Sequence, residues 1–419
     1  MTRTERQHIA IRNWIKNSGK GTFEFPTAFG KTFTAITAIK AVQKRYPDLR
    51  ILVVVPTTTL KDQWEEELNK HEIYFNVEVY VINTVVKHEW KCDMLIIDEY
   101  HSAGANEWSK VFDKVSYKLI LGLTATFERL DGKHELLSKY APIVDRVTTE
   151  EAIINEWIST YKEYQILIDV DDIEKYEEIN REFLEHFEFF GFDYNKGLMC
   201  TGPNGWRNKL RLRDEMYSGN DPERKKEVLQ AITIHSAGLM RTTQKRKAFI
   251  NNHPKKIEIA KKIMEARKDA KLITFSNNVK MCEALDNGNF VYTGQTSKAK
   301  GRVLIEDYLS GKIKRLHSSK KLIEGFNDPN TSVIIVLGHD SSERRAIQIR
   351  GRAIRRVENK NAEIFNIVIN NTQDTKWFKL SHSKNSNYIT IDEQGLEQVL
   401  NGDKPELYKK KIKELKFRF

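Results

Sequence analysis

The chain has 419 residues, a length that predicts two or three domains, each large enough for its own core. Hydrophobic residues make up 40% and charged residues 30% of the chain, which excludes a disordered or low-complexity protein. The formal net charge of +11 favours a polyanionic partner, and nucleic acid ahead of a membrane surface.

Other simple features narrow the class of protein further. No apolar run approaches the ~18 residues that would cross a bilayer, and the first residues lack the apolar core of a signal peptide. We therefore expect no membrane partner and a protein that stays in the cytoplasm. The three cysteines form no C-x-x-C pair, so we expect buried thiols and neither a zinc nor an iron-sulfur site: Cys92, Cys200 and Cys282.

Strand-like and helix-like stretches alternate in two parts of the chain. Residues 1–146 contain RILVVVP, VEVYVI, DMLIIDE and KLILGLTAT, and residues 257–371 contain KLITFS, NFVYTG, IKRLHSS, TSVIIVLG and AEIFNIVI. Continuous apolar strands of this kind are typical of parallel sheets covered on both faces. We therefore predict two α/β lobes in tandem, followed by a C-terminal extension over residues 372–419.

A loop in the first lobe reads FPTAFGKTFT, residues 25–34. It matches G-x-x-x-x-G-K-[ST] except that Phe25 stands at the first glycine. In this motif Gly30 lets the backbone approach a phosphate, Lys31 pairs with β and γ oxygens, and Thr32 binds Mg²⁺. From these residues alone, a helix that starts after a proline turn is the alternative.

Two acidic residues follow a later strand of the same lobe. The run MLIIDEYH places Asp98 and Glu99 at the end of an apolar strand, where ligands of open α/β sheets bind. Downstream of a lysine loop, Asp98 is suited to anchor Mg²⁺, and Glu99 to orient or deprotonate a water. Alone, the acidic pair could be a strand-ending turn with two solvated acids. Together with the lysine loop, it predicts a site for ATP and Mg²⁺.

Residues 147–256, between the two lobes, contain few strands. The stretch DIEKYEEINREFLEHFEFFGF repeats apolar residues at helical spacing, so we predict a linker and a largely helical insertion. Within it, Trp206 and Arg207 stand among further basic residues, a combination that can stack on bases and track phosphates. A packing face with Trp206 in the core and the charges in solvent is the alternative.

The second lobe carries arginines at helical spacing. In QIRGRAIRR, Arg352 and Arg355 are three residues apart and share one helix face. Read alone, they would form a solvated basic face. With a phosphate loop in the other lobe, we expect them to be arginine fingers that stabilise charge on the transferring phosphoryl group.

These motifs carry a family resemblance. DEYH resembles the DExH box of superfamily 2 helicases, and PTAFGKT resembles their motif I, which adds Thr27 to the ATP-binding set. The resemblance implies RecA-like lobes and an adenine-reading role for Gln7. TAT resembles motif III, which implies that Thr124 and Thr126 link hydrolysis to movement. His101 follows the acidic pair, and in this context we expect it to hydrogen-bond across the cleft and sense hydrolysis, the alternative being a structural histidine.

Further motifs extend the resemblance towards nucleic acid. VPTTTLKDQW resembles motif Ia, which implies that Thr57 and Gln63 lie near a nucleic-acid backbone, although the threonines can equally cap a helix. LITFSNN resembles motif IV, YTGQTS a backbone-contacting loop and HSSKKLIEGFNDPN motif V. The implied nucleic-acid contacts of the second lobe are Thr293, Gly294, Ser318, Ser319 and Lys320.

The motif V segment differs from the pattern of the family, whereas the motif VI segment matches it. Lys320 and Lys321 replace residues that are often acidic and apolar, and Asn327 replaces an acid, so the lysines are expected to add phosphate contacts. The spacing Q-x-x-G-R-x-x-R matches motif VI without a mismatch. It implies that Gln348 positions the attacking water.

Taken in order, the motifs are similar to those of superfamily 2 DNA helicases of the XPB and UvsW-like group of phages and microbes. This similarity implies an ATP-dependent DNA helicase or translocase with 3′ to 5′ polarity, located in the host cytoplasm if a phage encodes it. It would act on single-stranded, forked or branched DNA in replication, recombination or repair. The alternative is a nucleic-acid-stimulated ATPase that clamps or remodels without strand separation, with RNA as the other partner.

Overall fold

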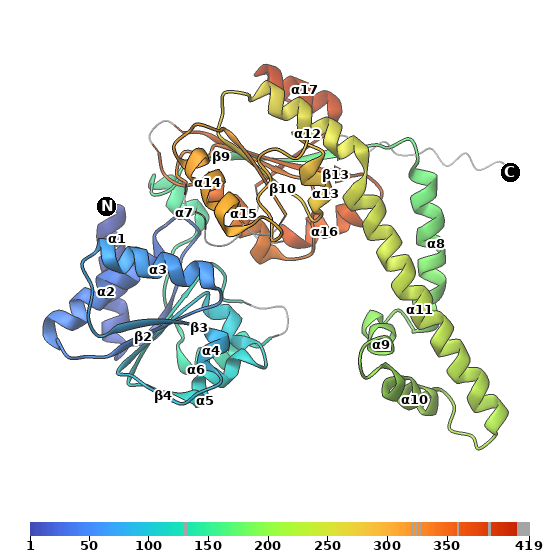
Figure 1. Cartoon of the computed structure of the whole chain (residues 1–419), viewed down its shortest axis with the longest axis horizontal. Helices are drawn as coiled ribbons and strands as arrows, with labels where there is room; N and C mark the ends of the chain where they lie inside the picture. Colours follow the sequence, from blue (N-terminus) through green and yellow to red (C-terminus); the bar gives the residue numbers. More distant parts are fainter. Residues whose placement is uncertain are drawn as a thin grey trace.

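The computed structural model consists of two lobes and a projecting helical arm (Figure 1). Within the described residues, two six-stranded sheets form the lobes, which confirms the predicted α/β class with a helical insertion. No helix of this part of the chain is long and apolar enough to cross a membrane. The structure describes residues 1–128, 132–319, 322, 326, 328–357, 360–383 and 387–408.

Lobe 1 is built on a parallel sheet in the order β3-β2-β5-β7-β1-β8. Every residue of β2 and β5 is buried, because helices cover both faces, as the continuous apolar runs predict. The strands are β1 (Lys20–Glu24), β2 (Ile51–Val55), β3 (Val77–Val81), β5 (Met94–Asp98), β7 (Leu119–Thr124) and β8 (Ile143–Arg146).

Separate cores lie on the two faces of this sheet. One contains the apolar sides of α1 (Arg3–Lys16), α2 (Lys31–Arg45) and α3 (Thr58–Lys70). The other contains α4 (Ile82–Val85), the 3₁₀ helix η1 (Tyr100–Gly104), α5 (Val111–Lys114) and α6 (His134–Tyr140). The ends of β1 and β5 therefore meet the starts of α2 and η1 at one edge of the lobe.

Lobe 2 has the order β11-β10-β12-β13-β9-β14, with parallel pairing throughout. Three short strands are β10 (Leu272–Phe275), β11 (Arg315–Ser318) and β12 (Val333–Val336), and the eight-residue β13 (Ala362–Ile369) is central. The helices of this lobe are α12 (Pro254–Ala266), which precedes β10, and α13 (Val279–Glu283), α14 (Lys298–Leu309), α15 (Glu343–Ala353), α16 (Gln373–Ser381) and α17 (Glu393–Asn401).

The boundaries predicted for lobe 2 were wrong at both ends. The strand β9 (Tyr161–Ile168), predicted to be part of the linker, pairs with β13 along its whole length, and β14 (Ile389–Ile391), predicted to be part of an extension, pairs with β9. Six consecutive residues of β9 are buried, so burial of this run explains its place in the sheet. The predicted strand NFVYTG contributes only an isolated bridge from Val291 to His317.

The arm leaves lobe 2 after β9 and returns to it at α12, as the predicted helical insertion. It comprises α8 (Ile173–Phe189), α9 (Tyr194–Met199), α10 (Gly205–Met216) and α11 (Pro222–Asn252). With 31 residues, α11 is about 46 Å long. It packs against α8 where Gly238 lets the ring of His186 approach, since a Cβ there would lie 2.1 Å from Nε2. Figure 1 shows α9 and α10 at the far end.

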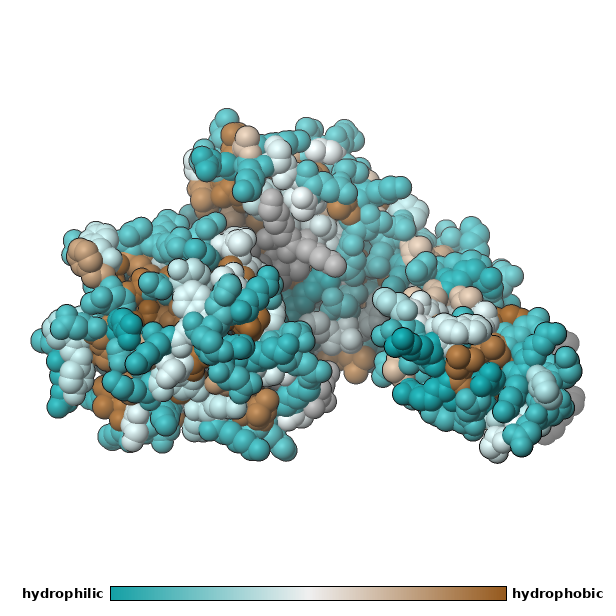
Figure 2. All heavy atoms as spheres, turned by 60° about the horizontal axis from the view of Figure 1, so that its bottom comes forward, coloured by the Kyte–Doolittle hydropathy of each residue, from teal (hydrophilic) through white to brown (hydrophobic). Residues whose placement is uncertain are grey.

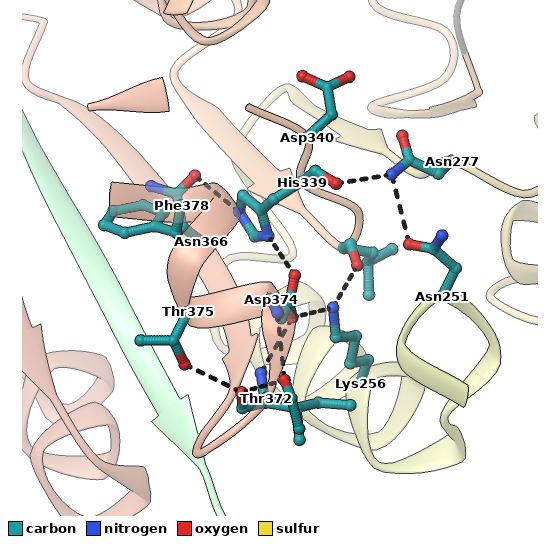
Figure 3. Close-up of polar contacts among 12 residues, drawn as sticks. Asn251, Lys256, Asn277, His339, Asp340, Asn366, Thr372, Asp374, Thr375 and Phe378 are labelled. Atoms are coloured by element: carbon teal, nitrogen blue, oxygen red, sulfur yellow. Dashed lines mark hydrogen bonds and ion pairs between the residues drawn. The ribbon is translucent and has the colours of Figure 1, made fainter. Parts of the chain in front are cut away.

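A buried ion pair anchors α12 to the lobe 2 sheet at the base of the arm (Figure 3). Lys256 and Asp374 are fully buried and 2.6 Å apart, and Lys256 Nζ also donates to the Leu337 carbonyl at 2.8 Å. Asp374 accepts from the Ile369 N–H at 3.0 Å, and its other oxygen lies 3.3 Å from His339 Nδ1. Against the effect of burial, Lys256 and His339 hold the pKa of Asp374 below its ordinary value.

We expect Lys256→Ala to destabilise lobe 2 by about 3–5 kcal/mol, because removing one partner leaves the other charge buried and uncompensated. Denaturant unfolding followed by circular dichroism measures the loss. The control is Lys255→Ala, since this neighbouring lysine forms partly exposed ion pairs with Glu258 and Glu393 and should cost less than about 1 kcal/mol. Equal losses in the two variants would contradict the anchoring role.

Candidate functional site

The loop after β1 explains why Phe25 stands at a position where glycine is usual. The Phe25 N–H donates to the Thr124 carbonyl at 3.0 Å, so this residue extends the strand. Its fully buried ring stacks on Phe23 and meets Phe29 edge to face, and Phe29 packs on Trp157. The phosphate loop therefore begins after Phe25, and these packed aromatic rings support it.

Gly30 ends this loop and directly precedes α2. Its φ of +99° lies in the left-handed region that glycine adopts freely. Ala28 also has a positive φ, +72°, at a cost of about 1–2 kcal/mol for a residue with a Cβ, so the loop keeps its shape despite the alanine. Because Lys31 and Thr32 begin α2, first-turn N–H groups without helical partners face the loop, as in an anion site.

Gln7 of α1 lies against the same loop. Its Nε2 donates to the Phe29 carbonyl at 2.9 Å, and the residue is 2% exposed. Its Oε1 is buried and has no hydrogen-bond partner among the described residues. A buried acceptor of this kind fits an amino group such as that of adenine.

The carboxylates of Asp98 and Glu99 sit at the end of β5. Burial, together with the Glu99 charge, raises the pKa of Asp98 to about 6. Trp64 Nε1 donates to Asp98 Oδ2 at 2.9 Å, and the Glu99 N–H donates to Oδ1 at 2.8 Å, so each oxygen retains a lone pair. This carboxylate and the Thr32 hydroxyl are oxygen donors, the kind that Mg²⁺ prefers.

Glu99 has a different environment from Asp98. Its φ of +50° is in the left-handed region, a strained conformation typical of functional sites. Burial opposes its ionisation, but the positive charges of Lys31, His101 and Arg344 hold the pKa of Glu99 below its ordinary value. Glu99 is therefore a half-buried, ionised acceptor beside the phosphate loop.

His101 and Thr124, the residues predicted to couple hydrolysis to movement, are in direct contact. The His101 Nδ1 lies 2.9 Å from Thr124 Oγ1, which donates to the Thr126 carbonyl at 2.7 Å. On its other side, His101 Nε2 lies 3.2 Å from the Ser102 hydroxyl, and that hydroxyl accepts from Arg344 of lobe 2 at 3.2 Å. A chain of contacts thus runs from the end of β7 to the second lobe.

The helix α15 of lobe 2 docks directly on the lobe 1 site. Gln348 Nε2 lies 3.4 Å from Glu99 Oε1, and Thr27 Oγ1 donates to the Ile347 carbonyl at 3.2 Å. At Gly351 the two lobes touch so closely that an added Cβ would lie 2.4 Å from the Thr27 Cβ. The sequence predicts that the phosphate loop of lobe 1 and the helix α15 of lobe 2 share one site. The structure brings these two segments into contact.

Of the two expected arginine fingers, Arg352 of α15 is buried and Arg355 is half-buried. The expectation that both share one helix face was wrong, because α15 ends at Ala353. Arg352 Nη1 and Arg355 Nη2 both donate to the Phe326 carbonyl of lobe 2, the latter at 3.0 Å. Burial lowers the pKa of Arg355 to about 10. Its Nη1 is buried without a hydrogen-bond partner among the described residues, which leaves a donor suited to an anionic ligand.

Several of the expected nucleic-acid contacts are used within the fold. The Thr57 hydroxyl caps α3 by accepting from the Leu60 N–H at 3.3 Å, which is the capping interpretation. The buried Ser318 hydroxyl accepts from the Leu322 N–H at 3.2 Å, and buried Thr293 accepts from the Gln295 N–H at 3.3 Å. Ser319 is also buried, Gln63 is half-buried and Gly294 is exposed, and Lys320 lies outside the described residues.

Trp206 lies on the surface of α10 at the tip of the arm. It is 63% exposed, so the interpretation that placed it in a core was wrong, and Arg207 beside it is also exposed. Large apolar side chains gather on this tip, and an open hollow separates it from lobe 1 (Figure 2). The exposed members are Phe192, Leu198, Met199, Trp206 and Met216.

Sequence reasoning missed three residues that shape the site: Trp64, Ser102 and Arg344. Trp64, which holds Asp98, directly follows Gln63 in the motif Ia segment. Arg344 lies four residues before Gln348 and therefore on the same helix face, a periodicity that points it towards lobe 1.

The structure has two parallel-sheet lobes in tandem. One lobe carries a phosphate loop, and an arginine-bearing helix of the other lobe packs against it. This arrangement is typical of a two-lobed nucleotide-hydrolysing motor. Residues 1–89 and 80–129 match the family model described as type III restriction enzyme, res subunit. Residues 255–357 match the helicase conserved C-terminal domain. The chain belongs to the superfamily 2 helicases and is an ATP-hydrolysing enzyme.

Individual relatives agree with this assignment. A DNA 3′-5′ translocase, XPB2 of Sulfurisphaera tokodaii, is 26% identical over 392 residues, which cover 88% of this chain and 82% of the relative. Helicase 22 of Sulfolobus islandicus filamentous virus is 21% identical over 91% of this chain and 67% of its own length. The structure of S. cerevisiae Dbp5 bound to RNA and ADP BeF3 shares the fold, with a TM-score of 0.59, 12% identity and coverage of 94% and 91%.

We expect Gly351→Ala to lower ATP turnover about tenfold or more. The added Cβ would collide with Thr27 and cost about 1–3 kcal/mol of lobe docking, while leaving each lobe folded. Steady-state ATPase assays measure kcat, and circular dichroism checks the fold. Gly202→Ala is the control because a Cβ there meets nothing within 4 Å. Wild-type turnover in Gly351→Ala would show that the docked arrangement is not the hydrolysing one.

Proposed function

We propose that the chain is an ATP-dependent DNA helicase or translocase that moves 3′ to 5′ and unwinds duplex or branched DNA. The observation that carries the proposal is the contact of Gln348 with Glu99, which joins a residue of lobe 2 to the carboxylate beside the phosphate loop. DNA and polarity rest on the likeness to XPB2, a DNA 3′-5′ translocase. A role in recombination or repair, in a virus such as a phage, belongs to the same proposal, and the viral relative supports the viral part of it.

In this proposal ATP binds between the lobes. Gly30 and the first turn of α2 hold the phosphates, Lys31 pairs with the β and γ oxygens, and Gln7 accepts from the adenine amino group. Thr32 and Asp98 would hold Mg²⁺, which supplies charge neutralisation of the β and γ phosphates when bound. Ionised Glu99 accepts a proton from the attacking water, which Gln348 orients.

The arginines act from the other lobe. An anionic phosphate oxygen is a stronger acceptor than a carbonyl, so Arg352 and Arg355 exchange the Phe326 carbonyl for the γ phosphate when ATP binds. Both lobes then share one ligand, and hydrolysis removes it. His101 and Thr124 transmit this change to the loop at Thr126 through the hydrogen bonds that join them.

Nucleic acid binds on the outer faces of the lobes and at the arm tip. Exposed Trp206 offers a stacking surface, and the adjacent Arg207 offers a phosphate contact. Gly294 is exposed in lobe 2, where the backbone can approach a strand. The other expected contacts stay predictions, although the structure buries three of them, Thr293, Ser318 and Ser319. The rest are Thr57, Gln63 and Lys320. Because phosphate and stacking contacts carry little base information, we expect low sequence specificity.

We expect ATP turnover to rise with DNA, and strand displacement to accompany it. ATPase rates with single-stranded DNA, duplex, fork, four-way junction and RNA, beside displacement assays on the same substrates, test this. Stimulated turnover with no displacement on any fork or junction would favour the clamp or remodeller, and stimulation by RNA alone would overturn the DNA assignment. Lys31→Ala is the matched variant: it should abolish turnover and leave DNA binding largely intact, since Lys31 contacts only the nucleotide in this scheme.

Trp206→Ala should weaken binding to forked DNA by about 1–3 kcal/mol, the contribution of one base stacked on an aromatic ring. Fluorescence anisotropy with a labelled fork at fixed salt measures the change. Basal ATP turnover should stay at the wild-type level because Trp206 lies in the arm, outside the two lobes. Trp108→Ala serves as a control, since Trp108 lies in lobe 1 and donates to Asn83. Unchanged affinity in Trp206→Ala would remove the arm tip from the binding surface.

A further inference from the structure

The end of α11 is hydrogen-bonded to the segment after β10, the part of the chain that resembles motif IV. Asn251 Oδ1 accepts from Asn277 Nδ2 at 3.3 Å, and Asn252 Oδ1 accepts from Asn278 Nδ2. Asn251 and Asn252, in the last turn of α11, are thus hydrogen-bonded to two consecutive asparagines of lobe 2. The arm therefore has a polar attachment to the lobe in addition to its chain connections.

Asn277 joins this attachment to α15. Besides Asn251, its Nδ2 donates to the His339 carbonyl at 3.0 Å (Figure 3). Its Oδ1 accepts from Arg345 Nη1 at 2.5 Å, and the same guanidinium nitrogen lies 2.7 Å from Asp340 Oδ2. Arg345 belongs to α15, three residues before Gln348, so a single amide joins the arm to the helix that touches Glu99.

A second set of contacts runs beside the first. Arg246 of α11 donates to Gln373 Oε1 at 3.0 Å, and Asp374 next to it lies 3.3 Å from His339. From there a buried series continues through Asn366 and Glu163 to Arg350 of α15, whose Nε donates to Glu163 at 2.8 Å. Both sets start at the base of the arm and end on α15.

We propose that Asn277 is a positioning residue that couples the arm to α15, so that nucleic acid held by the arm raises the rate of ATP hydrolysis. The inference rests on the proposed function, because it requires the arm to bind nucleic acid. The proposal requires that α15 exchanges between the docked arrangement seen here and an undocked one, and that a force on the arm biases this equilibrium through the Asn277 amide. ATP biases the same equilibrium from the other end.

Two variants separate this coupling from ordinary structural support. Asn277→Asp keeps the acceptor for Arg345 but removes the donor to Asn251 and the His339 carbonyl. Asn251→Ala removes only the acceptor on the arm and places a better helix former in α11. Asn370→Ala is the matched control, since within the described part of the chain the Asn370 side chain is hydrogen-bonded to Asp169, Tyr408 and the Asn371 N–H, and to no residue of the arm or α15.

The experiment measures basal ATP turnover, turnover at saturating forked DNA and fork affinity for each variant, alone and combined with Trp206→Ala. We expect Asn277→Asp and Asn251→Ala to keep basal turnover and affinity within about twofold of wild type, and to lose about fivefold or more of the stimulation, a typical size for coupling between sites. Combined with Trp206→Ala, they should lose no further stimulation, whereas Asn370→Ala should behave as wild type.

The outcomes distinguish this inference from the function on which it rests. Wild-type stimulation in Asn251→Ala and Asn277→Asp, or losses that add fully to that of Trp206→Ala, would overturn the coupling and leave the helicase proposal standing. A wild-type enzyme that no nucleic acid stimulates would overturn both. A merely structural role for Asn277 predicts lower basal turnover and affinity together, which also contradicts the coupling.

Discussion

The docking of α15 on lobe 1 is the constraint on which the site depends. Lobe 1 supplies the phosphate loop and the carboxylates, but Gln348 and Arg352 come from α15 of lobe 2, and Arg355 follows two residues after its end. Close approach is possible because Gly351 has no Cβ at the point where the helix meets Thr27. The proposed hydrolytic groups are therefore complete only while the lobes are together, an arrangement that can link a chemical step to the relative motion of the two lobes.

Lobe 1 holds its half of the site in an unfavourable backbone conformation. Ala28 and Glu99 both have positive φ values without being glycine, and they lie at the ends of β1 and β5. Such strain persists only where surrounding structure fixes it. Here Phe25 and Phe29 pack beneath the loop, and Trp157 of the linker packs on Phe29. The linker thus supports the loop as well as joining the lobes, and the Ser159 N–H donates to the carbonyl of Ile354 just after α15.

The sequence predicted the parts of this arrangement that are local. The lysine loop, Asp98 after its strand and the helix with Gln348 and Arg352 each occupy a short stretch, so spacing alone indicated them. What failed was long-range pairing: β9 joins the second sheet although the whole arm separates it from the next strand, and no periodicity encodes a partner so far along the chain. Residue type was also ambiguous, because the same hydroxyl can cap a helix, as Thr57 does, or bind phosphate.

The position of the arm within the chain has a mechanical consequence. Both of its connections enter lobe 2, and at their base Asp172 lies 2.9 Å from His253, so α8 and α11 leave the lobe as a joined pair. A change in the angle of lobe 2 is carried to the tip by α11, and over a lever of about 46 Å a rotation of only about 4° displaces the tip by about 3.4 Å, the rise of one nucleotide along a DNA strand. Small rearrangements around α15 are therefore large enough, once carried along the arm, to match the spacing of the polymer on which the enzyme acts.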